Sequence, residues 1–176
     1  MMGTRCGSVD PGVLLYVLQH KGLDADQLDK VLNHESGLLG VSGFSSDMRE
    51  VLAELAGNPD AELAVSVYVH RIRQTVGAMA ASLGGIDALV FTAGVGENAP
   101  EIRRRACENM KFLGLELDED ANETCRPDAD IAMPCSPARI LVVATREDLT
   151  VMRETRRLLA PPQSHYGGIS QPPLSQ

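Results

Sequence analysis

The chain has 176 residues, of which 44% are hydrophobic and only 3% aromatic, so one domain of ordinary size would have to build its core from aliphatic side chains. A formal net charge of −8 argues against a general nucleic-acid binder, which normally presents a basic face. No apolar run approaches the length of a membrane span, and no signal-peptide pattern opens the chain. The cysteines form no CxxC pair, which argues against a zinc site and favours reduced thiols in the cytoplasm: Cys6, Cys107, Cys125 and Cys135.

The first part of the chain is predicted to be helical. Asp10 followed by Pro11 is a typical helix start, because the carboxylate can cap and proline is favoured in the first turn. This helix should stop near Gly22, and a second helix should span about 25 to 33. Residues 37–43 contain three glycines and are predicted to be a loop.

The next helices are predicted from caps and periodicity. Two serines and an aspartate at 45–47 offer capping side chains for a short helix that reaches about Leu55. The longest helix is expected at about 60 to 83, because its apolar residues recur at steps of three and four. Two glycines at 84 and 85 should end it.

A glycine-containing segment follows the first strong strand. Asp87 to Thr92 is an apolar run with a β-branched residue and predicts a buried strand. Gly94 and Gly96 then predict a tight turn, and Pro100 the start of a helix. Backbone N–H groups exposed at such a turn attract anions such as phosphate. The segment lacks both the Gly-Lys-Ser/Thr of a P-loop and the third glycine of a dinucleotide fingerprint, so an ordinary turn remains the alternative.

Shorter elements are predicted after this turn. The helix from Pro100 should extend to about 110, with the arginines at 103–105 on a solvated face. A short strand is expected near 115–117, and the acidic residues at 118–120 are predicted to form a turn.

The last part of the chain combines a strong strand with a helix. A weak edge strand near 131–133 precedes the strand at 139–144, and Thr145 is expected to cap a helix from 147 to 159. Residues 161–176 are rich in proline, glutamine, serine and glycine and are predicted to be a disordered tail.

Strands separated by helices predict an α/β fold. Both strong strands end at small or polar residues that lead into a helix. Because ligands of open α/β sheets usually bind beyond the carboxyl ends of the strands, the turns at 93–98 and 144–147 are expected to face one cleft.

Four sequence blocks, at 3–11, 35–49, 91–98 and 144–149, resemble in the same order those of the acetate and propionate kinase family of the actin-like ATPase superfamily. The resemblance implies the C-terminal domain of an actin-like, ribonuclease-H-like ATPase fold, with a mixed sheet and flanking helices. Residues 1–160 would then form a nucleotide-binding domain. The first domain of family members would be absent, because the chain begins at a block past their middle.

The resemblance also implies roles for individual residues. Arg5 would be catalytic, binding the phosphoryl group in transfer, and Glu147 would help to bind Mg²⁺. The adenosine moiety of ATP or ADP would contact Asp47, Met48 and Arg49. The loop near the nucleotide phosphates would consist of Gly94, Val95, Gly96, Glu97 and Asn98.

The implied reaction is reversible transfer of the γ-phosphoryl group of ATP to acetate, which gives acetyl phosphate and ADP. We expect little or no turnover from this chain alone, because about half of the implied cleft would be missing. The alternatives are a non-catalytic nucleotide-binding or dimerisation remnant, with helix 60–83 contacting another chain, and a kinase of propionate. A cytoplasmic homodimer that binds neither nucleic acid nor membrane is the implied state.

Overall fold

The computed structural model describes residues 1–159, which fall into two units, one spanning residues 1–144 and one beginning at Thr145. The second unit contains helix α9 (Glu147–Leu159), at the range that the sequence predicts. Its first turn is acidic and its last turn is basic, which suits the helix dipole. The predicted tail at 161–176 lies outside the described residues. Among residues 1–159, no helix has the length and apolar character needed to cross a membrane.

The first unit begins with two helices, each of which is capped by an aspartate. Helix α1 (Pro11–His20) is capped by Asp10, whose Oδ1 accepts a hydrogen bond from the Gly12 N–H at 2.6 Å. Helix α2 (Ala25–His34) begins with a capping box in which Asp24 and Gln27 bond each other's backbone N–H groups. Both helices confirm the ranges expected from the sequence.

The glycine-rich segment after α2 is a helix, α3 (Gly37–Ser42), and the predicted loop is wrong. Leu38 is buried, and α3 packs against the long helix α5 (Pro59–Leu83). Gly37 has a φ of 62°, and a Cβ there would overlap the carbonyl oxygen of Met2. Position 37 therefore requires glycine because the backbone of the N-terminal loop passes too close to leave room for a side chain.

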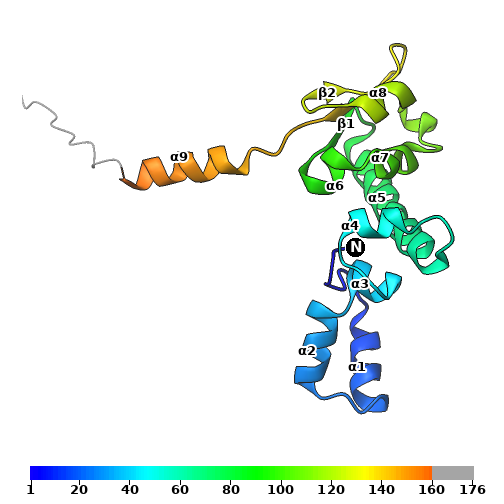
Figure 1. Cartoon of the computed structure of the whole chain (residues 1–176), viewed down its shortest axis with the longest axis vertical. Helices are drawn as coiled ribbons and strands as arrows, with labels where there is room; N and C mark the ends of the chain where they lie inside the picture. The colour runs from blue at the N-terminus through cyan, green and yellow to red at the C-terminus, as the bar shows by residue number, and fades with distance from the viewer. Residues whose placement is uncertain (160–176) are drawn as a thin grey trace, which may run out of the picture. The chain divides into compact units, whose positions relative to one another are not determined.

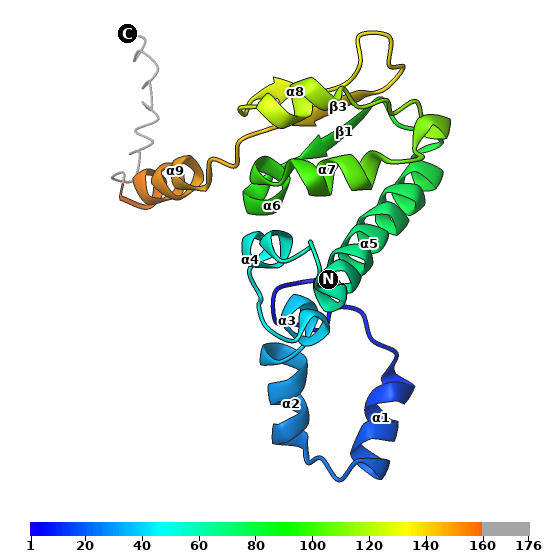
Figure 2. The ribbon, with the colours of Figure 1, turned by 45° about the vertical axis from the view of Figure 1, so that its right-hand side comes forward.

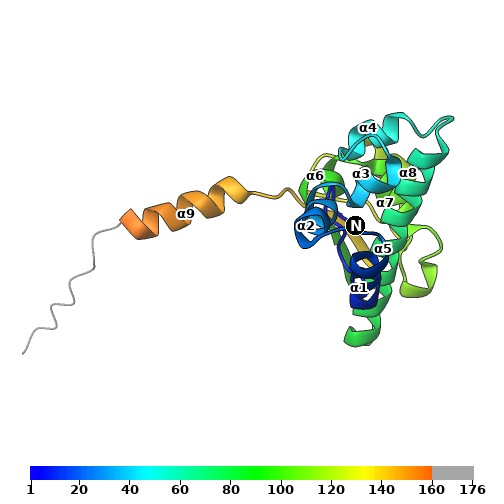
Figure 3. The same cartoon turned by 90° about the horizontal axis from the view of Figure 1, so that it is seen from below.

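Helices α4 (Met48–Ala53) and α5 form the first core together with α3. Asn58 caps α5 by accepting from two backbone N–H groups. The helix ends at Gly84, as the sequence predicts, and this glycine has a left-handed conformation. Figure 3 shows α3 and α4 beside α5. The buried residues of this core are mainly aliphatic and come from α3, α4, α5 and the segment 99–102: Leu38, Met48, Val51, Ala61, Ala64, Val65, Val69, Ala99 and Ile102.

The sheet of the described chain has three strands in the order β1-β3-β2. Strand β1 (Ala88–Phe91) pairs in parallel with β3 (Arg139–Val142), and β2 (Ala129–Asp130) pairs antiparallel with β3. Figure 2 shows α5 running from α3 and α4 towards this sheet, and Figure 1 shows the same order of elements. The mixed sheet with flanking helices confirms the predicted α/β class.

Several short elements between the strands differ from the predictions. The expected turn at 93–98 is helix α6 (Ala93–Asn98), which is followed directly by α7 (Pro100–Cys107) and a 3₁₀ turn (Lys111–Leu113). The acidic turn is the start of α8 (Glu119–Thr124), because Asp118 caps that helix and carboxylates favour a helix N-terminus.

The weaker strands are also shorter or shifted. The strand expected near 115–117 is reduced to isolated bridges at Leu115 and Leu117. The edge strand expected near 131–133 starts earlier, at Ala129, and Ala132 forms only a bridge with Leu117. A second core surrounds the sheet and includes Phe91, Ile140 and Val142.

Candidate functional site

A pocket of about 740 Å³ lies between α4 and α6. It is formed by two segments that are far apart in sequence, and α4 and α6 face each other in both Figure 1 and Figure 2. Six of the residues that the sequence predicts for nucleotide binding line it, together with three neighbours: Asp47, Met48, Arg49, Gly94, Val95 and Asn98, with Ser46, Leu52 and Ala99. The fold therefore joins the two predicted segments in one concave surface.

The α4 side of the pocket is held by the turn that leads into the helix. Asp47 Oδ1 accepts from the Arg49 N–H at 2.9 Å, and the Arg49 guanidinium donates to both carboxylate oxygens of Asp47. These hydrogen bonds from Arg49 lower the pKa of Asp47 to about 2. The N–H of Asp47 donates in turn to the buried Ser45 hydroxyl at 3.0 Å. Asp47 is thus an ionised, oriented acceptor at the pocket wall.

The two glycines of α6 have different surroundings. A Cβ on Gly94 would have no atom within 4 Å, whereas a Cβ on Gly96 would lie 3.2 Å from the carbonyl carbon of Phe91. Gly94 therefore leaves the pocket open, and Gly96 allows α6 to pack closely on β1. Neither glycine has a positive φ, because both lie within helix α6 rather than in the predicted tight turn. The left-handed residue is Ala93, with a φ of 60°.

Arg5 lies on the exposed N-terminal loop rather than in the pocket wall. The loop is tied to the end of α2 and the start of α3: the Cys6 N–H donates to Leu32 O and the Ser36 N–H to Thr4 O, each at 2.9 Å. Within residues 1–159 the Arg5 guanidinium forms no hydrogen bond or ion pair. The same loop reaches the rim of the pocket at Ser46, because a Cβ on Gly3 would lie 3.3 Å from Ser46 O.

Three other predicted site residues do not line the pocket. Gly96 packs towards Phe91, and the backbone oxygen of Glu97 accepts a hydrogen bond from Arg103 at 2.9 Å. Glu147 is the exposed first residue of α9 and belongs to the second unit. Its predicted place beside the turn at 93–98 stays a prediction. Among residues 1–159 there is no cluster of three or more His, Cys, Asp or Glu side chains that could hold a metal ion.

Arg103 is the important residue that the sequence interpretation missed. It was expected on a solvated face, but it is 1% exposed and bonds backbone oxygens of α6 and α8. Its spacing could have revealed this, because it lies four residues from Ala99 and from Cys107, which are both buried. The expectation is also wrong for its two neighbours, since Arg104 and Arg105 are half-buried and paired with Glu101.

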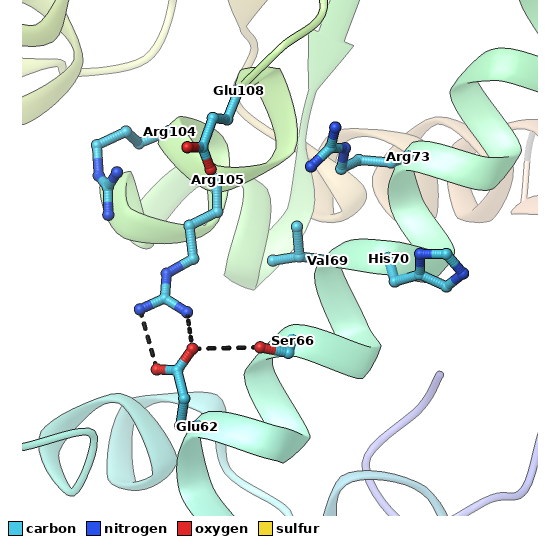
Figure 4. A pocket seen from close by; sticks show the side chains of 8 residues that line it. All are labelled: Glu62, Ser66, Val69, His70, Arg73, Arg104, Arg105 and Glu108. Atoms are coloured by element: carbon cyan, nitrogen blue, oxygen red, sulfur yellow. Dashed lines mark hydrogen bonds and ion pairs between the residues drawn. The ribbon is translucent and has the colours of Figure 1, made fainter. Parts of the chain in front are cut away.

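A second pocket, of about 550 Å³, lies between α5 and α7 and contains several charged side chains. Figure 4 shows the Arg105 guanidinium directed at the Glu62 carboxylate, which also accepts from Ser66. The hydrogen bond from Arg105 lowers the pKa of Glu62. Because Arg105 also pairs with Glu101, its donors are already engaged, and this pocket is better explained as an ion-pair network that joins two helices.

Comparison with known proteins identifies the family to which the chain belongs. Residues 1–153 match the model of the acetokinase family. The chain belongs to the acetokinase family. The acetate kinase of Nostoc punctiforme is 52% identical over 160 residues, which cover 90% of this chain and 40% of that protein. The acetate kinase of a Cyanothece species is 48% identical over 160 residues, covering 90% of this chain and 39% of that protein. The resemblance seen in the four sequence blocks is confirmed.

Solved structures agree with the acetokinase fold. The acetate kinase of Porphyromonas gingivalis matches with a TM-score of 0.84 and 44% identity, over 91% of this chain and 41% of that chain. A propionate kinase from Francisella tularensis matches with a TM-score of 0.80 and 36% identity, over 87% of this chain and 39% of that chain. The chain thus spans about 40% of the length of the acetokinase relatives that it matches.

Proposed function

We propose that this chain carries the nucleotide-binding part of an acetate kinase, which transfers the γ-phosphoryl group of ATP reversibly to acetate. The observation that supports this function is the pocket between α4 and α6. It joins the segments at 47–49 and 94–98, which the family resemblance assigns separately to the adenosine and phosphate ends of a nucleotide. In this proposal residues 1–160 act as the nucleotide-binding domain.

The chemistry of the pocket walls suits a nucleotide. A carboxylate with a pKa of about 2 stays ionised at neutral pH, so Asp47 can accept hydrogen bonds from ribose hydroxyl groups. The side chain of Arg49 is 87% exposed beside it, and its guanidinium can stack on a base. Across the pocket, Gly94 leaves room for a ligand to approach the backbone of α6.

Arg5 is proposed to bind the phosphoryl group during transfer. A planar guanidinium offers paired donors to phosphoryl oxygens and compensates their charge without changing its own protonation. The Arg5 side chain is exposed, while hydrogen bonds at Thr4 and Cys6 fix the backbone on either side of it. The loop can therefore present the guanidinium to a phosphate that extends from the pocket rim at Ser46.

Mg²⁺ is proposed as the metal cofactor, with Glu147 as its protein ligand. Mg²⁺ is often held by one or two carboxylates together with substrate phosphates and water, so a single exposed carboxylate suits it better than a ready-made cage. When bound, Mg²⁺ neutralises phosphate charge and orients the oxygens. Glu147 is an exposed residue in the first turn of α9.

The remaining partners follow from the same proposal. Acetate is the second substrate, and a homodimer is supported by apolar side chains that α5 leaves exposed, namely Leu63, Met79 and Leu83. A cytoplasmic location fits the four cysteines, all of which are free thiols. Propionate in place of acetate is the alternative substrate, since a propionate kinase shares the fold.

Calorimetry with Mg-ADP tests the proposed site on the purified chain. We expect saturable binding that is lost in Gly94→Val, whose side chain would occupy the pocket, and kept in Gly77→Ala, which lies in α5 away from it. Absence of heat at millimolar nucleotide would reject the function. Because the chain spans two fifths of its relatives, we expect hydroxamate trapping to detect little acetyl phosphate; clear turnover would contradict that expectation.

A further inference from the structure

The guanidinium of Arg103 holds together helices α6, α7 and α8, of which α6 lines the nucleotide pocket. Its Nη1 donates to Gly96 O and Glu97 O, both at 2.9 Å. Its Nε and Nη2 donate to the side-chain and backbone oxygens of Asn122, both at 2.8 Å. One side chain of α7 therefore bonds the end of α6 and the end of α8.

All four acceptors of Arg103 belong to neutral groups, although the side chain is 1% exposed. Burial of a charged group without a paired carboxylate is costly, and burial indeed lowers the pKa of Arg103. A methionine or leucine would fill similar space in a purely apolar core without that cost. The guanidinium is thus better explained by its hydrogen bonds to α6 and α8 than by a contribution to the stability of the core.

The two α6 oxygens that Arg103 bonds belong to residues that lie, along the chain, between residues of the pocket wall. Gly96 and Glu97 are flanked by Val95, Asn98 and Ala99, which line the pocket. A six-residue helix leaves most of its last carbonyl groups without partners inside the helix, so α6 depends on outside donors for its end geometry.

Asn122 extends the same network to the beginning of α7. This side chain is fully buried, accepts from Arg103 and donates from Nδ2 to Pro100 O at 3.1 Å. The α6–α7 junction at Ala99 is therefore held on both sides, by Arg103 before it and by Asn122 after it.

We propose that Arg103 is a positioning residue that fixes the α6 wall of the nucleotide pocket from behind. Its link to nucleotide binding rests on the proposed function, whereas its effect on α6 does not. Arg103 touches no ligand in this proposal. It presents Gly94, Val95 and Asn98 at a fixed distance from α4, so that nucleotide need not order them on binding.

Two substitutions and one control test the proposal. Arg103→Met keeps the bulk of the side chain and removes all donors, while Arg103→Lys keeps the charge but cannot bond both ends of the network at once. The control is Arg104→Met, which removes a neighbouring arginine of the same helix that is half-buried and paired with Glu101.

Hydrogen exchange without nucleotide gives the first readout. The amide of Ala99 donates to Val95 O at 3.0 Å and reports on the end of α6. We expect about tenfold faster exchange there in both Arg103 variants and no change in Arg104→Met, with β3 unchanged in all three. If exchange in Arg103→Lys became equally faster in α6 and in β3, Arg103 would serve general folding, and the proposal would be overturned. Unchanged exchange at the end of α6 in this variant would overturn it as well. If Arg103→Met does not fold, the exchange rates of Arg103→Lys test the proposal by themselves.

Affinity for Mg-ADP gives the second readout. We expect a dissociation constant about tenfold higher in Arg103→Lys and unchanged in Arg104→Met. Faster α6 exchange with unchanged affinity would overturn the role in nucleotide positioning. Faster α6 exchange in a chain whose wild type binds no nucleotide would reject the proposed function and leave the control of α6 by Arg103 standing, so the two failures are distinguishable.

Discussion

The two glycines of α6 should respond in opposite ways to the same substitution. Replacement of glycine by alanine within a helix adds about 0.5–1 kcal/mol to stability, because alanine loses less backbone entropy. At Gly94 nothing opposes this gain, since the added Cβ has no atom within 4 Å. We therefore expect Gly94→Ala to raise the free energy of unfolding by about 0.5–1 kcal/mol.

At Gly96 the same methyl group meets the backbone of β1. The added Cβ would lie 3.2 Å from the carbonyl carbon and 3.5 Å from the Cα of Phe91. Phe91 cannot move easily, because it is buried and its strand pairs with β3. Overpacking of this kind costs about 1–3 kcal/mol, so Gly96→Ala should lower stability by a net of about 1 kcal/mol.

Urea unfolding followed by circular dichroism measures both effects, with Gly77→Ala as the control. Gly77 lies within α5, and a Cβ there also has no atom within 4 Å, so this variant reports helix propensity alone. Gly94→Ala should also weaken Mg-ADP binding, since its methyl group enters the pocket. Equal stabilisation by Gly94→Ala and Gly96→Ala would refute the reasoning from close packing on Phe91.

Three further outcomes follow from caps, charges and burial. Asn58→Ala should lower the stability of the chain by about 1 kcal/mol in urea unfolding, because α5 loses its N-cap, and Asn58→Ser should restore most of it. Hydrogen bonds from Arg105 lower the pKa of Glu62 from its usual 4.5, so the stability that this pair contributes is present above about pH 4.5 and lost as the pH falls further. The urea midpoint of Arg105→Gln should therefore fall less than that of the wild type between pH 5.5 and pH 3.5, and parallel curves would contradict the ion pair. Burial raises the pKa of Cys107 to about 12, so mass spectrometry should find iodoacetamide on the exposed Cys135 at pH 8 long before it appears on Cys107 in folded protein.

The sequence predicted the starts of α1, α4 and α5 well because their signals are local. Asp10, Asp47 and Asn58 each cap a helix within three residues of their own position, and the distance between a cap and its N–H partner hardly depends on the rest of the fold. The apolar runs also predicted β1 and β3, but burial of the first run is only partly correct: Ile140 and Val142 of β3 are buried, whereas in β1 Phe91 is buried and Val90 is exposed.

The candidate site was predicted in part. The family resemblance assigned the segments at 47–49 and 94–98 to one nucleotide, and the fold joins them in one pocket. The resemblance could not reveal that Gly96 packs on Phe91 and that the backbone oxygen of Glu97 bonds Arg103, so that neither residue lines this pocket. Which side of a six-residue helix faces a ligand is decided by what packs behind it.

The amino-acid sequence by itself determined the family and the main elements, namely α1, α2, α4, α5, α7, α9 and the strands β1 and β3. Only the tertiary structure decided that Gly37–Ser42 is helical, that Arg103 is buried and that α4 faces α6. The physical reason is the range of the interactions. Caps and periodicity act within about one helical turn, whereas burial and hydrogen-bond partners such as Asn122 for Arg103 depend on segments that meet only after the chain has folded.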